Sequence, residues 1–97
     1  MIIAAARITL LIPENDSLKG KRKVVKSLIE KVRHKFEAAV AEVGDNDLWQ
    51  KAQIGVAVVG NDSQLLNTRL SQIMSYMENQ HLAEIIDSQV ELCYLEK

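Results

Sequence analysis

The sequence Ile2-Ile3-Ala4-Ala5-Ala6-Arg7-Ile8-Thr9-Leu10-Leu11-Ile12-Pro13 carries an apolar residue at every even position. This alternation is typical of a strand with one face against a core. The odd positions are more varied and include Arg7 and Thr9, so the other face is partly open to water or to a partner. Pro13 ends the pattern because proline cannot donate to a sheet ladder. We therefore expect a strand at 2–12.

Two helical patterns and three more strand patterns follow along the chain. Apolar residues at helical spacing predict a first helix that begins at Asp16 or Ser17, and a second that is capped within 60–63 and closes at 79–81. The expected buried stripes are Val25, Leu28, Ile29, Val32 and Phe36 in the first helix, and Leu66, Leu70, Ile73, Met74 and Met77 in the second. Alternating runs predict strands at 38–43, 52–59 and 86–95, with a turn at 44–47. The order βαββαβ predicts a ferredoxin-like α+β fold, with a four-stranded antiparallel sheet and both helices on one face.

Composition indicates an ordinary folded protein. Apolar residues make up 47% and charged residues 26% of the 97 residues, which predicts one domain over 1–97. Cys93 is the single cysteine, so no internal disulfide can form and a cytoplasmic location is expected. The apolar start is interrupted by Arg7, which argues against a signal peptide and against a membrane span.

The distribution of charge carries most of the functional information. The net charge is −1, yet eight of the 12 Lys and Arg residues lie within 19–35, where Glu30 is the sole acid. Cations at the start of a helix are opposed by the helix dipole, at about 0.3–1 kcal/mol per group. Phosphate provides a reason to keep them there. The predicted phosphate or RNA contacts are Lys19, Lys21, Arg22, Lys23 and Lys26.

A second interpretation of the same residues is a solvated helix face. In that case Glu30 pairs with Lys26 and Arg33, and the other charges serve solubility. In either case, replacing Lys19, Lys21, Arg22 and Lys23 with glutamine should leave the fold intact or slightly more stable, because repulsion among these cations and with the helix dipole is relieved.

The open face of the sheet suggests a different kind of contact. RNA-recognition modules of this topology stack bases on aromatic residues of the two central strands, and 2–12 and 52–59 contain none. The face is nevertheless rather apolar for open water, so it is either a self-association or partner surface, or a half-apolar surface that a small protein tolerates. Its candidate interface residues are Ile3, Ala5, Thr9, Gly55, Ala57 and Val59.

Catalytic and metal sites are not expected. His34 and His81 are far apart and match no ligand spacing with Cys93, so neither a metal nor another cofactor is predicted. An acyl phosphatase of this fold needs a glycine-rich loop with an arginine after the first strand, where this chain has the acidic turn 13–16. No motif places a serine beside a base. The chain is therefore not expected to be an enzyme.

Trp49 has two possible roles. It either anchors a partner or covers the edge of the core.

Four segments resemble the YlxP-like family of small bacterial proteins of unknown function. They are Ser17-Leu18-Lys19-Gly20-Lys21-Arg22-Lys23-Val24-Val25-Lys26-Ser27-Leu28, Val40-Ala41-Glu42-Val43, Asp47-Leu48-Trp49-Gln50 and Val58-Val59-Gly60. The family usually carries an acid or another side chain where Gly20 stands. The resemblance implies a ferredoxin-like fold. It also implies association with ribosomal RNA or ribosomal particles, because such proteins are often encoded beside genes for translation initiation and ribosome maturation.

Two classes of function therefore remain open. The first is a non-catalytic module that binds RNA or a ribosomal particle through the basic helix and serves ribosome maturation or translation. The second is a homodimeric protein-interaction or small-ligand-sensing domain that associates through its sheet face.

Overall fold

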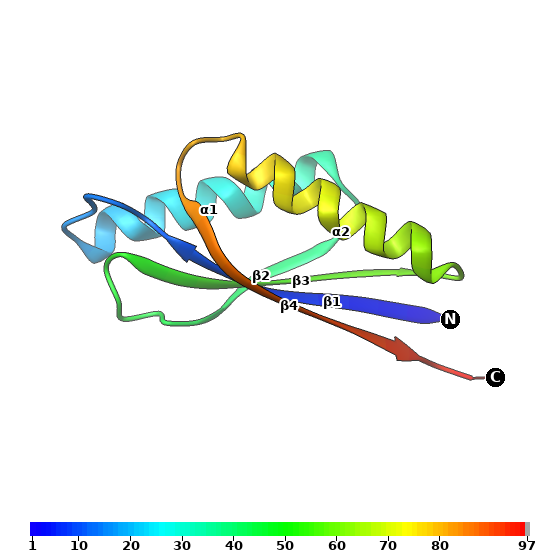
Figure 1. The fold of residues 1–97 in the computed structure, drawn as a ribbon. Helices are drawn as coiled ribbons and strands as arrows, with labels where there is room; N and C mark the ends of the chain where they lie inside the picture. Colours follow the sequence, from blue (N-terminus) through cyan, green and yellow to red (C-terminus); the bar gives the residue numbers. More distant parts are fainter. Residues whose placement is uncertain (97) are drawn as a thin grey trace.

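The computed structural model describes residues 1–96 and confirms the predicted ferredoxin-like α+β fold. Its elements are β1 (Ile2–Leu11), α1 (Leu18–Lys35), β2 (Ala39–Gly44), β3 (Lys51–Gly60), α2 (Ser63–Glu78) and β4 (Glu84–Tyr94). The four strands form one antiparallel sheet in the order β2-β3-β1-β4. Figure 1 shows both helices on the same face of this sheet, which leaves the other face bare.

The core lies between the helices and the even positions of the central strands. Ala4, Ile8, Ile54 and Val58 are examples of these buried residues, and β1 pairs with β3 in a register that sets Ala4 against Val58. From α1 the core receives Val25, Leu28 and Val32, and from α2 it receives Leu66, Leu70, Ile73 and Met77. The alternation along β1 therefore has the predicted cause, because one face of the strand is buried and the other is not.

The helix ends follow from local chemistry. Ser17 caps α1, with its hydroxyl accepting from the Gly20 amide at 3.0 Å, and Asp62 caps α2. Phe36, which the sequence assigned to the buried stripe, is the C-cap of α1 and is only half-buried. Its ring meets the ring of Tyr76 edge to face, with centroids 5.6 Å apart, so it joins the two helices near their ends.

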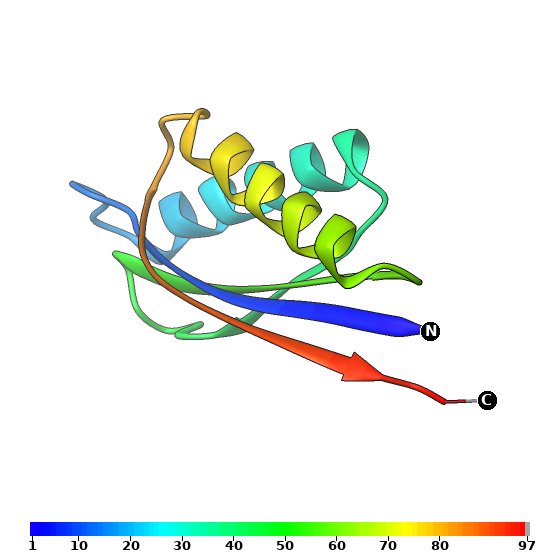
Figure 2. The same cartoon turned by 45° about the vertical axis from the view of Figure 1, so that its right-hand side comes forward.

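The two edge strands differ in length and in cover. β2 is short and has a bulge between Glu42 and Gly44, whereas β4 pairs along the whole of β1 and has a shift opposite Thr9 and Leu10. Figure 2 shows the carboxyl half of β4 running away from the helices. Val90 and Tyr94 are accordingly exposed.

Candidate functional site

Four of the five predicted phosphate contacts form one exposed row on α1. Lys19, Arg22, Lys23 and Lys26 are all exposed and are spaced i, i+3, i+4 and i+7, which places them on one face of the helix. At 1.5 Å per residue the row is about 10 Å long. The first turn of α1 holds no acid, and within residues 1–96 the four side chains take part in no ion pair. The row is therefore free to meet an anion.

Lys21 departs from the prediction. Its side chain is 1% exposed, and its ammonium group lies 3.3 Å from Glu42 Oε2 of β2 and donates a hydrogen bond to the Asp45 carbonyl. Glu42 Oε2 has no hydrogen-bond partner within the described residues, so the ion pair with Lys21 compensates it. Lys21 thus compensates the charge of a half-buried carboxylate whose Oε2 is covered, and it holds α1 against the end of β2. Its ammonium group is not available to phosphate.

Other cations of α1 also have partners within the protein. Arg33 donates from Nη2 to the Val40 carbonyl on the edge strand, and Lys35 Nζ lies 5.0 Å from the centre of the Tyr76 ring. Glu30 forms no ion pair with Lys26 or Arg33 in the part of the chain that is described. The basic segment thus divides into cations that hold α1 in place and cations that project into solvent.

One of the amides at the start of α1 is already engaged. The Ser17 hydroxyl accepts from the Gly20 amide, so this amide is not available to a bound anion. A Cβ atom at Gly20 would meet Asn15 Oδ1, so glycine leaves room here for the Asn15 side chain. Asn15 uses the space to donate from Nδ2 to the Ser17 carbonyl at 2.8 Å and to the Trp49 carbonyl.

A groove lies beside Arg22 and Lys26 of the row, between α1 and the edge strand β2. It has a volume of about 460 Å³, and Arg22, Lys26 and Arg33 supply its cationic side. Its other lining residues are Val25, Ile29, Glu30, Ala41 and Glu42. Cations beside apolar side chains suit a ligand that carries both charge and apolar surface, and a nucleotide is one such ligand.

The bare sheet face is the second candidate site. In the pairing of β1 with β3, Ile3 lies opposite Val59, Ala5 opposite Ala57, Arg7 opposite Gly55 and Thr9 opposite Gln53. All six residues predicted for the interface therefore lie on the face without helices. Val59 is 58% exposed. The sequence missed Val43, which the bulge of β2 turns onto this face, where its side chain occupies the space that a Cβ at Gly55 would need.

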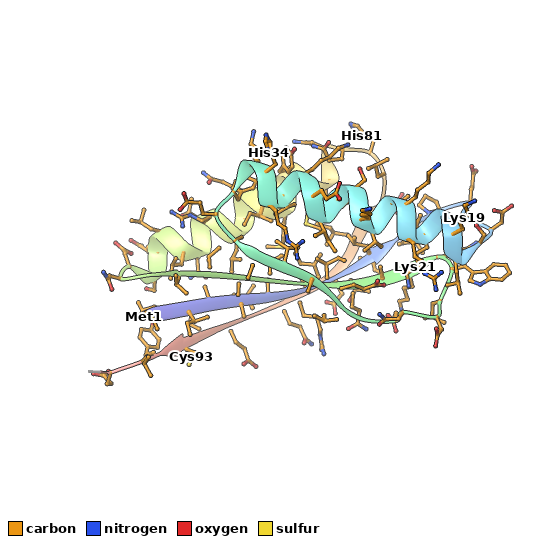
Figure 3. The ribbon with its side chains drawn as sticks, turned by 180° about the vertical axis from the view of Figure 1, so that it is seen from behind. Met1, Lys19, Lys21, His34, His81 and Cys93 are labelled. Atoms are coloured by element: carbon orange, nitrogen blue, oxygen red, sulfur yellow. The ribbon has the colours of Figure 1, made fainter. Side chains whose placement is uncertain are left out.

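The remaining chemistry-bearing residues are not brought together. His34, His81 and Cys93 lie on different parts of the fold in Figure 3. Among residues 1–96 no group of three or more His, Cys, Asp and Glu side chains is placed to hold a metal ion. In the same range no helix has the length and apolar character needed to cross a membrane.

Comparisons with known proteins place the chain in a family. The profile of the family described as Protein of unknown function (DUF503) matches residues 3–90. The Bacillus subtilis (strain 168) protein described as Uncharacterized protein YlxP is 28% identical over 78 residues, which cover 80% of this chain and 85% of that protein. A solved structure described as Structural Genomics, protein YJCS has a TM-score of 0.52 at 13% identity, over 92% of this chain and 96% of that one. The last similarity shows the fold alone.

Proposed function

Since the chain belongs to the family described as Protein of unknown function (DUF503), as the YlxP-like resemblance predicted, we propose its function from the geometry of α1. It is a non-catalytic module that binds the phosphate backbone of cytoplasmic RNA, and ribosomal RNA or ribosomal particles are the expected targets. One observation carries the proposal. Lys19, Arg22, Lys23 and Lys26 share an exposed helix face, within a chain whose net charge is −1.

The position of the row supports binding because helix stability alone does not favour it. Cations in the first turns are opposed by the helix dipole, and acids there would be more stable. Lys21 and Arg33 have protein partners that explain their charge, whereas the exposed row has none among residues 1–96. A polyanion on the row would compensate both the dipole and the mutual repulsion of the four cations.

The salt dependence of RNA binding tests the proposal. A labelled 12-nucleotide oligouridine is titrated with the protein at several KCl concentrations, and binding is followed by fluorescence anisotropy. Four phosphate contacts give a slope of log affinity against log salt of roughly −3 for a single strand. Changing Lys19, Arg22, Lys23 and Lys26 to Gln should bring that slope close to zero.

A matched variant separates the row from the overall charge. Lys31, Lys51 and Arg69 are exposed cations elsewhere on the surface, and changing all three to Gln lowers the net charge by a similar amount. This control should keep most of the wild-type slope. Equal affinity and equal slope for the row variant and the wild type would refute the proposal. Sedimentation of cell lysate addresses the target, because wild type should travel with ribosomal particles while the row variant stays at the top.

The bare sheet face favours a second candidate function, association with a second copy of this chain. The small side chains of Ala5 and Ala57, together with Gly55, make the centre of this face flat. Val43 and Val59 are exposed on it. Ala57→Glu would bury a carboxylate without a partner in such a dimer, so the folded variant should elute later than the wild type in size-exclusion chromatography. A wild type that is already monomeric at high concentration would rule this candidate out.

A further inference from the structure

The loop between β2 and β3 is tied to the start of α1 at both of its ends. At its first residue, the Asp45 carbonyl accepts a hydrogen bond from the Lys21 ammonium group. At its other end, Asn15 donates to the carbonyls of Ser17 and Trp49, and Gln50 Nε2 donates to the Asn15 carbonyl at 3.1 Å. Figure 3 shows Lys19 and Lys21 at the end of the molecule where this loop lies. The loop is thus held against the first turn of α1.

Trp49 does not cover the core edge, which was one of the two roles open to it. Its side chain is 53% exposed, and neighbouring Leu48 is 48% exposed. A single bridging residue, Asn15, joins the Trp49 carbonyl to the N-cap residue of α1. The backbone of Trp49 is therefore held beside the first turn of α1, which carries Lys19, and its aromatic side chain is exposed to water.

We propose that Trp49 stacks on an unpaired base of single-stranded RNA whose phosphates lie along the exposed row of α1. This inference rests on the proposed function and adds the class of RNA to it. Duplex RNA keeps its bases covered, whereas a single strand can turn a base out onto an aromatic ring. The central strands offer no aromatic residue for this purpose, and the chain has no tryptophan other than Trp49.

Acidic side chains near Trp49 determine whether a phosphate or a base of the RNA can lie beside it. Asp16 and Asp47 are exposed in the two loops at this end, and they repel a phosphate placed directly over them. The Asp45 carboxylate is engaged instead, because it accepts from Gln53 Nε2 at 3.0 Å. A neutral base is therefore the part of the RNA that fits Trp49, and the phosphates extend towards Lys19 and Lys23.

The intrinsic fluorescence of Trp49 provides the test, because no other tryptophan contributes to the signal. Unlabelled 12-nucleotide oligouridine should quench the emission with the same midpoint as the anisotropy titration. Trp49→Ala should weaken binding by about 5- to 150-fold, the range that loss of one base stack gives. The salt slope should not change, since no phosphate contact is removed.

Three controls are available. Leu48→Ala removes a neighbouring side chain of similar exposure and should change the affinity less than twofold. Trp49→Phe keeps an aromatic ring and should recover most of the lost affinity, which also guards against a folding defect. Inorganic polyphosphate should bind the row without quenching Trp49, because it carries charge but no base.

The outcomes distinguish this inference from the proposed function. RNA binding with an unquenched Trp49 and an unchanged affinity for Trp49→Ala would overturn the stacking and leave the RNA-binding function standing. No binding of RNA by the wild type would overturn both. Equal quenching by polyphosphate, or equal affinity for a duplex of the same length, would also contradict stacking. If Trp49 contacts a protein partner instead of RNA, RNA should still bind, but without quenching Trp49 and with the same affinity for Trp49→Ala.

Discussion

The two sides of α1 use the same residue types for different purposes. On the side that faces the sheet, Lys21 is buried against Glu42 of β2. On the solvent side, Lys23 and its neighbours in the row have no partner among residues 1–96. Lys21 and Lys23 are two residues apart and therefore point about 200° apart around the helix axis. The cations of a basic helix therefore do not form one surface. Each must be classified by whether its charged group is buried in the protein or exposed to solvent.

Removal of the Lys21 charge is expected to have the largest effect on stability. In Lys21→Met, the Glu42 carboxylate remains at the end of β2 without its cation, and the Asp45 carbonyl loses its donor. Breaking a fully buried ion pair from one side costs about 3 kcal/mol of unfolding free energy, and because the Glu42 side chain is 21% exposed we expect a loss of about 2 kcal/mol here. Urea unfolding followed by circular dichroism measures the loss. A loss below about 1 kcal/mol would mean that the pair does not hold α1 to β2.

Two further variants sharpen this result. Lys21→Met with Glu42→Leu should regain most of the stability, because no charge is then left buried. The same double variant should keep the wild-type salt slope of RNA binding, since no cation of the exposed row is changed. Lys23→Met is the matched exposed change and should alter the unfolding free energy by less than about 0.5 kcal/mol.

Much of the fold could be predicted because its signals are local. Alternation in β1 and β3 and the caps at Ser17 and Asp62 depend on neighbouring residues alone. The start of β4 was harder, since the strand begins at Glu84, two residues before the predicted boundary. A register shift opposite Thr9 and Leu10 breaks the alternation there, and a sequence pattern does not show such a shift.

The candidate site was predicted only as far as helix geometry determines it. The exposed row follows from spacing within α1, but the position of Lys21 depends on Glu42 and Asp45, which are distant in sequence. One local signal was present, because Lys21 lies in line with Val25, Leu28 and Val32 on the buried stripe. The contact between Asn15 and Trp49 has no such signal. It joins loops 34 residues apart and needs the missing Cβ of Gly20.

Neutralising the exposed row is expected to have the smallest effect on stability. The effect should be a small gain, whereas neutralising the buried Lys21 should cause a loss. Changing Lys19, Arg22, Lys23 and Lys26 to Gln removes four cations that repel one another and that oppose the helix dipole, while Gln has nearly the helix propensity of Lys. The unfolding free energy should therefore rise, by about 0.5 kcal/mol in urea unfolding at low salt, since the dipole acts mainly on Lys19 in the first turn. The gain should disappear at about 0.5 M KCl, where charges are screened within a few ångström. The earlier expectation joined Lys21 to this set, and including Lys21→Gln should turn the small gain into a loss. A loss of more than about 1 kcal/mol without any change at Lys21 would show that the row also stabilises the fold.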